Sequence, residues 1–344
     1  MYQWAKVRRP PQVRVTAACA LILLLLGCVN TDERIPRGAR PLEVPVGRLD
    51  RLLFHTDSVR KALQQADAEF GSFFRVYVEE VLHMASIDDP RLPRLMYSFT
   101  HDPDWRSAQS AIDSMLGDMT GARTGFGLAF GRLHAVFPDS LIPRVVIFNS
   151  GFNYGIFPTD SVLGVGAEWF IGPQQPVVTY LAPDVFPKYI RDRMVPEMLL
   201  PGAMKGWLMV HYQPDVRGKD LLTHLVETGK VMALLDALLP DTDHTLKFAF
   251  TRDQLKWCAD NEYMIWKELV AKEMLFSSSP EVIDRIMNDA PFTNGFPRES
   301  PGHIGEWVGY RMVKSYLDDH PEMTFGELFA LRDPRAVLQR YKPR

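Results

Sequence analysis

Residues 143–182 decide the fold class of this chain, and they read PRVVIFNSGFNYGIFPTDSVLGVGAEWFIGPQQPVVTYLA. Three short runs in this stretch, at 145–148, 162–166 and 177–180, are rich in β-branched residues, and Gly, Asn, Ser and Pro residues separate them. Runs of this kind between turn-forming residues are typical of strands. The stretch therefore predicts a small β-sheet.

The sequence on both sides of this stretch has helical periodicity. Apolar residues recur every three to four positions, as one face of an α-helix requires. Two capping boxes, Thr251 with Gln254 and Thr324 with Glu327, mark helix starts. The predicted helical segments are 59–70, 73–82, 102–115, 126–137, 194–212, 220–239, 251–269 and 300–312, and Pro201-Gly202 is expected to interrupt the segment 194–212. We expect a mainly helical α+β protein with a small inserted sheet, folded as a single domain over residues 48–344.

The overall composition excludes several classes of protein. The 344 residues are 46% hydrophobic and 24% charged, with a formal charge of −3. This composition supports a packed core and is unlike that of disordered chains, collagen-like fibres or polytopic membrane proteins. There is no basic run interleaved with aromatic residues, so we expect no nucleic-acid partner.

The amino-terminal residues are typical of an export signal. Four basic residues precede an apolar run of twelve, Val15 to Leu26, which is too short to span a bilayer. The run ends in Leu25-Leu26-Gly27-Cys28, and this resembles a bacterial lipobox, in which cleavage precedes the cysteine and the thiol is acylated. We predict a signal peptide at 1–27 and lipid attachment at Cys28. The alternative is an ordinary signal peptide whose cleavage site contains a cysteine.

Cleavage there would change both the charge and the cysteine content of the chain. Removing residues 1–27 takes away four positive charges and no negative ones, which leaves a formal charge of −7. Cys258 would be the remaining thiol, so no intramolecular disulfide is expected. Residues 28–47 are polar, contain three prolines and lack periodicity, and they predict a flexible tether between lipid and domain.

Glu262 is the most distinctive carboxylate of the sequence. It lies with Leu255, Cys258 and Ile265 on the apolar face of its predicted helix, so we expect it to be buried. A buried carboxylate is costly unless it is paired. We expect its neighbour Asn261 to be buried too. Both are therefore candidate functional residues, either braces between helices or, for Glu262, a metal ligand or acid–base group.

His211, His224 and Glu227 are the other candidates for chemistry. They could contribute metal ligands, but the chain has no HExxH motif to place two histidines on one helix face. GxGxxG, GxxxxGK[ST] and GxSxG motifs are absent as well. We predict no catalytic residue, no metal and no cofactor.

An ordered series of motifs resembles the gliding-motility lipoprotein GldB family. After the lipobox the series contains Phe73-Phe74, Ser150-Gly151-Phe152, Glu168-Trp169-Phe170, Gly229-Lys230, the Gln254 to Trp266 block, Ala290-Pro291-Phe292-Thr293, the Ser300 to Gly309 block and Tyr341-Lys342-Pro343. One departure is that Thr228, rather than an acid, directly precedes Gly229-Lys230, and the acid is Glu227.

This resemblance implies a lipoprotein on the periplasmic side of the outer membrane. It implies a non-catalytic component that supports gliding motility and the display of adhesins exported by type IX secretion. The implied partners are outer-membrane lipid, through acylated Cys28, and other proteins of the gliding or secretion machinery. The family also resembles predicted zinc proteases, which implies a degenerate zincin-like metalloprotease fold. Their HExxH would fall near residues 194–212.

Two other functions remain open at this point. The first is a metal-dependent hydrolase of the zinc-protease kind with an unusual ligand set taken from His211, His224, Glu227 and Glu262. The second is a module that binds cell wall or polysaccharide, which would need exposed tryptophan and tyrosine side chains.

Overall fold

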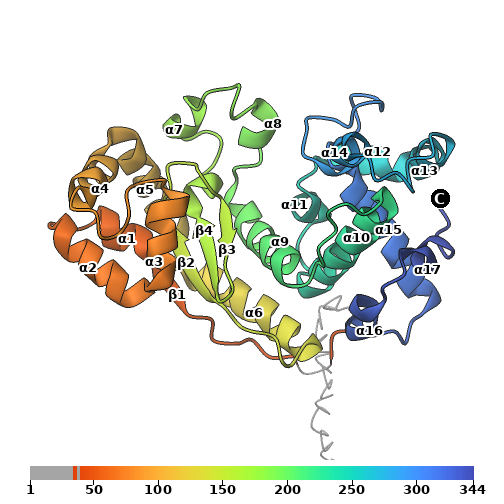
Figure 1. Ribbon diagram of the computed structural model, residues 1–344, viewed down its shortest axis with the longest axis horizontal. Coiled ribbons are helices and arrows are strands. Elements are labelled where there is room, and N and C mark those ends of the chain that lie inside the picture. Colours follow the sequence, from red (N-terminus) through yellow and green to blue (C-terminus); the bar gives the residue numbers. More distant parts are fainter. Residues whose placement is uncertain (1–33, 37–38) are drawn as a thin grey trace, which may run out of the picture.

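The computed structural model describes residues 34–36 and 39–344, and within them a four-stranded sheet divides helical layers (Figure 1). The strands are β1 (Val46–Arg48), β2 (Arg144–Phe148), β3 (Ile156–Pro158) and β4 (Val162–Gly166), in the order β1-β2-β4-β3. β1 and β4 run parallel to β2, and β3 pairs with β4 in the antiparallel direction at the edge. The predicted fold class, mainly helical α+β with a small sheet, is confirmed.

Alternate residues of β2 belong to two different hydrophobic cores. Val146 and Phe148 pack among the amino-terminal helices, whereas Val145 and Ile147 join the main core of the molecule. This follows from the two-residue repeat of a strand. Since both faces of β2 are covered, its sequence is continuously apolar from Val145 to Phe148.

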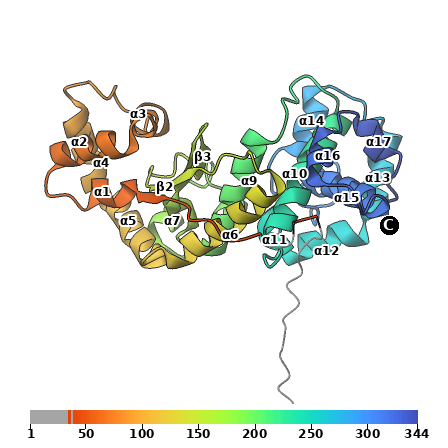
Figure 2. The ribbon, with the colours of Figure 1, turned by 90° about the horizontal axis from the view of Figure 1, so that it is seen from below.

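The amino-terminal helices occupy one end of the molecule and a long helix runs under the sheet (Figures 1 and 2). They are α1 (Leu49–Phe54), α2 (Val59–Phe70), α3 (Ser72–Val76) with a π-helical turn at Tyr77–Val81, α4 (Leu92–His101), α5 (Pro103–Leu116) and α6 (Thr120–Val136). Asp102 caps α5 by accepting the backbone N–H of Asp104, as a residue before a first-turn proline commonly does.

The carboxyl-terminal half is helical and is built around two long helices. Its elements are α7 (Pro176–Thr179), α8 (Lys188–Arg191), α9 (Leu199–His211), α10 (Leu221–Leu238), α11 (His244–Phe248), α12 (Arg252–Asp260), α13 (Glu262–Ala271), α14 (Pro280–Met287), α15 (Ile304–Asp319), α16 (Phe325–Ala330) and α17 (Pro334–Leu338). α10 and α15 touch backbone to backbone, because a Cβ on Gly309 would lie 1.9 Å from the carbonyl oxygen of Leu225.

Three predictions about local structure are wrong. Residues 177–179 are helical rather than extended, because Pro176 begins α7 with a φ already suited to a helix. The helix predicted over 251–269 is interrupted at Asn261, where φ is −118° and ψ is 15°. The segment at 194–212 becomes α-helical only at Leu199, after a short 3₁₀ turn at Pro196–Met198, and α9 then continues through Pro201 and Gly202 because a proline is tolerated in the first turn of a helix.

The predicted tether is also shorter than residues 28–47. Ile35 and Val44 are buried, the Leu42 N–H donates to the carbonyl of Gly127 at 3.0 Å, and β1 begins at Val46. The Arg34 side chain donates to the Leu317 carbonyl at the end of α15. This segment is therefore packed on the domain. The predicted signal peptide 1–27 and Cys28 lie outside the described residues.

None of the helices in the described part of the chain combines the length and the apolar character that crossing a membrane requires.

Candidate functional site

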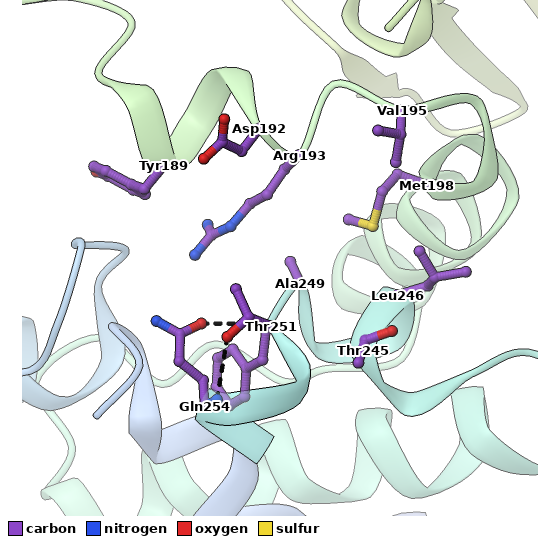
Figure 3. A pocket seen from close by; sticks show the side chains of 11 residues that line it. Tyr189, Asp192, Arg193, Val195, Met198, Thr245, Leu246, Ala249, Thr251 and Gln254 are labelled. Carbon is purple, nitrogen blue, oxygen red and sulfur yellow. Dashed lines mark hydrogen bonds between the residues drawn. The ribbon is translucent and has the colours of Figure 1, made fainter. Parts of the chain in front are cut away.

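A cleft lies between the sheet side and the carboxyl-terminal helices, and two hollows form it. The helix-side hollow, of about 190 Å³, lies between the segment 189–198 and the residues from Thr245 to Gln254 (Figure 3). The strand-side hollow, of about 290 Å³, is lined by Ile156 of β3 and by Trp169. Arg193 and Met198 line both hollows, so the two are neighbours, and we call them together the cleft.

The walls of the helix-side hollow are mostly apolar. Val195 and Met198 stand on one side, and Leu246, Ala249 and Phe250 stand on the other. Polar groups lie at its margin, namely Tyr189, Asp192, Thr251 and Gln254 (Figure 3). An apolar hollow with a few converging polar groups is the usual form of a ligand-binding site.

An ionic cluster joins the two walls of the cleft. Arg193 donates from one Nη to both carboxylate oxygens of Asp289, at 2.9 and 2.8 Å. His303 holds the same carboxylate through Nδ1, at 2.9 Å. Burial by itself would raise the pKa of Asp289, but the hydrogen bond from His303 and the charge of Arg193 more than offset burial and lower the pKa to about 2. Asp289 is therefore ionised.

Both ring nitrogens of His303 face acceptors. Nδ1 faces the Asp289 carboxylate and Nε2 faces the backbone carbonyl of Phe248 at 2.9 Å. These two contacts fix the orientation of the His303 ring. Its backbone is in the left-handed region, with φ at +38°, directly before α15. A non-glycine residue held there is strained and is over-represented at functional sites.

A second ion pair lies beside the first. Lys205 of α9 donates to Glu306 of α15 at 2.5 Å, and Glu306 lies 4.0 Å from the His303 ring. Arg193, Lys205 and the His303 ring thus surround two carboxylates, Asp289 and Glu306. We call these five side chains the ionic cluster.

A buried carboxylate, Glu168, organises the loop behind the cleft. Its Oε1 accepts the Ser150 hydroxyl at 2.5 Å and the N–H groups of Ser150 and Phe152 at 2.8 and 3.1 Å. Its other oxygen, Oε2, is buried with no partner among the described residues. Burial raises the pKa of Glu168 to about 7, although the hydrogen bonds from Ser150 favour the carboxylate. The residue is therefore poised between its two protonation states near neutral pH.

Glu262 is buried, as expected, and it joins three parts of the chain. Its Oε1 accepts from Arg311 Nε of α15 at 3.1 Å and from the Tyr341 hydroxyl at 2.9 Å. Asn261 is only half buried, and its side-chain amide donates to the Trp257 carbonyl of the preceding helix. The expectation that Asn261 is buried is wrong, because it lies at the break between α12 and α13.

The other three candidates do not meet. His211 is exposed and faces the Thr159 carbonyl at 3.1 Å. Glu227 is buried in an ion pair with Lys230 at 2.8 Å. His224 is half buried with an unpartnered Nε2, and burial lowers its pKa. Across residues 34–36 and 39–344, no group of three His, Cys, Asp or Glu side chains is placed to hold a metal ion.

The residues of the cleft were not among the sequence candidates. Arg193, Asp289 and His303 are far apart in the chain, so a single sequence carries no sign of their contact. Gln254, His303, Glu168 and Trp169 do lie in motifs of the resemblance, and this was the available signal. Cys258 is buried, as predicted, and burial raises the pKa of its thiol.

Comparison with known proteins gives one match. No curated protein and no solved structure matches the chain, so the expected likeness to metalloproteases stays a prediction. The family described as gliding motility protein GldB matches residues 32–343, which is most of the chain. The match spans the sheet, the cleft and both core helices. The chain therefore belongs to the GldB family of gliding-motility lipoproteins.

Proposed function

We propose that the protein is a lipid-anchored, non-catalytic component on the periplasmic side of the outer membrane. There it supports gliding motility and the type IX-dependent display of adhesins, together with other proteins of that machinery. The observation that carries the proposal is the family match over residues 32–343. The Gly27-Cys28 site lies just before the matched region, where a lipoprotein anchor belongs.

The side chains of α9 support the non-catalytic part of the proposal. This helix lies in the stretch where the resemblance would place an HExxH motif, and its buried residues are apolar, among them Ala203, Met204 and Trp207. Its histidine, His211, is at the exposed carboxyl-terminal end. The helix therefore contributes packing rather than metal ligands.

The packed amino-terminal segment limits the distance between the domain and the membrane. Arg34 is fixed to the end of α15, and six residues, 28–33, precede it after cleavage. Six residues span at most about 20 Å when fully extended. An acylated Cys28 would therefore keep the domain close to the bilayer, with the α15–α16 end nearest to it.

The test is Cys28→Ala in the full chain, expressed in a gliding host that lacks its own copy. We expect the variant to leave the outer-membrane fraction and to lose gliding and surface display of adhesin. Cys258→Ala is the matched control, because it removes the buried thiol and should keep the membrane fraction unchanged. An outer-membrane location with normal display for Cys28→Ala would refute the anchor.

A further inference from the structure

We propose that the cleft binds the carboxyl-terminal end of a partner polypeptide, with the terminal carboxylate on Arg193 and an apolar last side chain in the helix-side hollow. The proposal rests on the non-catalytic function above, because it treats the cleft as a recognition site. It assigns a ligand class to residues for which neither the motifs nor the family match gives a role.

Arg193 has an open edge toward the hollow. One Nη holds Asp289, whereas Nε and the other Nη donate to no group of the described chain. The guanidinium projects into the space between Tyr189 and Gln254 (Figure 3). A guanidinium presents parallel N–H groups that match a carboxylate. The N–H groups of Arg193 that Asp289 leaves unused can therefore donate to an anion at this edge.

A second donor lies across from Arg193. Gln254 uses its Oε1 to accept the Thr251 N–H at 3.0 Å, which orients the side chain. Its amide nitrogen is then on the side away from Thr251 (Figure 3). Asp192, the acid at the margin of this hollow, is paired with Lys188 at 2.6 Å, so its charge is compensated. The site therefore offers hydrogen-bond donors to a carboxylate. The acid at its margin is already neutralised and would repel that carboxylate little.

The hollow suits one apolar side chain. The hollow has a volume of about 190 Å³, and it lies between Met198 and Val195 on one side and Phe250 on the other. A terminal residue carries its carboxylate and its side chain on the same Cα. This matches a charged rim directly beside an apolar hollow, and recognition of a chain end by such a site is a recurring mode.

The strand-side hollow gives the preceding residues a path. β3 is half exposed at the edge of the sheet, and Ile156 lines this hollow. Gly155 and Thr159 pair with β4 through backbone hydrogen bonds. In an antiparallel pair, hydrogen-bonded and non-hydrogen-bonded positions alternate along the strand, so the N–H and C=O of Ile156 point away from β4. Pro158 has no N–H, which limits the edge to a short pairing. An extended chain can thus pass Ile156 and Trp169 and end at Arg193.

The experiment uses the full chain, purified in detergent, and a pool of random hexapeptides with free carboxyl termini. A second pool is identical except that every terminus is amidated. Bound peptides are identified by mass spectrometry, and one enriched peptide is made in both forms for titration. We expect enrichment of apolar last residues in the free-acid pool, and binding at least about tenfold weaker for the amide.

Three variants locate the binding. Arg193→Met removes the carboxylate partner and should weaken binding about tenfold or more. Val195→Trp fills the hollow without touching the ionic cluster and should abolish selection of apolar last residues. Arg217→Met is the matched control, because Arg217 is exposed and lines neither hollow, and it should bind as the wild type does. Circular dichroism establishes that each variant is folded.

Two results would overturn the proposal. They are the absence of enrichment in the free-acid pool or equal binding of acid and amide forms by the wild type, and a folded Arg193→Met that still binds the acid form as tightly as the wild type does. Either result leaves the proposed anchor and motility role intact, since Cys28→Ala tests those separately. If Cys28→Ala has no effect on membrane location or display while peptide selection persists, the anchor is refuted and the peptide site stands.

Discussion

The hydroxyl of Ser150 donates to Glu168 at 2.5 Å, and this bond joins the loop after β2 to the turn after β4. Parallel strands place their carboxyl ends at the same edge of a sheet, so the two residues meet although 18 positions separate them. The same Ser150 oxygen accepts the N–H groups of Asn153 and Tyr154. One buried carboxylate thereby fixes the loop that adjoins the strand-side hollow.

Glu168 should make the stability of the folded protein fall as the pH rises through neutrality. Its pKa is raised from 4.5 to about 7, so between these values the folded chain holds a proton that the unfolded chain has lost. The contribution of Glu168 to the free energy of unfolding is fully present below about pH 4.5. It declines as the pH rises to about 7, by about 3 kcal/mol in total.

Glu168→Gln keeps the shape of the protonated acid and removes the titration. We expect its free energy of unfolding in urea to match the wild type near pH 4.5 and to exceed it near pH 8. Glu197→Gln, at an exposed position, is the control and should show no such divergence. A difference between Glu168→Gln and wild type that stays constant with pH would contradict the assignment.

Particular residues show how much of this structure the sequence could predict. β2 and β4 were found because their apolar runs are covered on both faces, and α12 because Thr251 and Gln254 form its capping box. β1 and β3 were missed, since three residues are too few to show a period. The β-branched residues at 177–179 suggested a strand, but Pro176 and the local packing favour a helix.

The candidate site was less predictable for a different reason. Glu262 was found because its own helix shows the apolar face on which it lies. Arg193, Asp289 and His303 come from three separate segments, and only the folded chain brings them together. Glu168 lies in a 3₁₀ turn, which has no long apolar face from which burial can be inferred.

The full chain should hold no stoichiometric metal. Glu227 and Glu262 are already committed to Lys230 and Arg311, and His211 is exposed and far from a shared centre. Elemental mass spectrometry of protein purified without chelator should find less than about one zinc in ten chains, and EDTA should leave the Tm unchanged because no metal is linked to folding. Near-stoichiometric zinc would revive the hydrolase alternative.

Removing the Glu262 carboxylate should destabilise the protein more than removing either donor. Glu262→Ala leaves both the Tyr341 hydroxyl and the Arg311 guanidinium without their acceptor, and we expect a loss of about 3 kcal/mol. Tyr341→Phe removes one hydrogen bond to a charged group and should cost about 1.5 kcal/mol.

A double-mutant cycle checks this assignment by chemical denaturation. In the Glu262→Ala background, Tyr341→Phe should cost little, because the hydroxyl has already lost its acceptor. Additive losses would show that the two side chains act independently. Tyr263→Phe is the control, since Tyr263 is exposed on α13.

The contact between α10 and α15 should tolerate no side chain at Gly309. A Cβ there would lie 1.9 Å from the Leu225 carbonyl oxygen, and a Cβ on Gly229 would lie 2.2 Å from the carbonyl oxygen of Gly309. Both obstacles are backbone atoms, so the helices must move apart. Because α10 and α15 form the centre of the main core, Gly309→Ala should lower the free energy of unfolding by at least about 2 kcal/mol.

Gly121→Ala is the matched control, since nothing lies within 4 Å of its Cβ position in α6, and helix propensity should raise stability there by up to about 1 kcal/mol. Equal effects of the two alanines in thermal unfolding would mean that the helices are not packed this closely in solution.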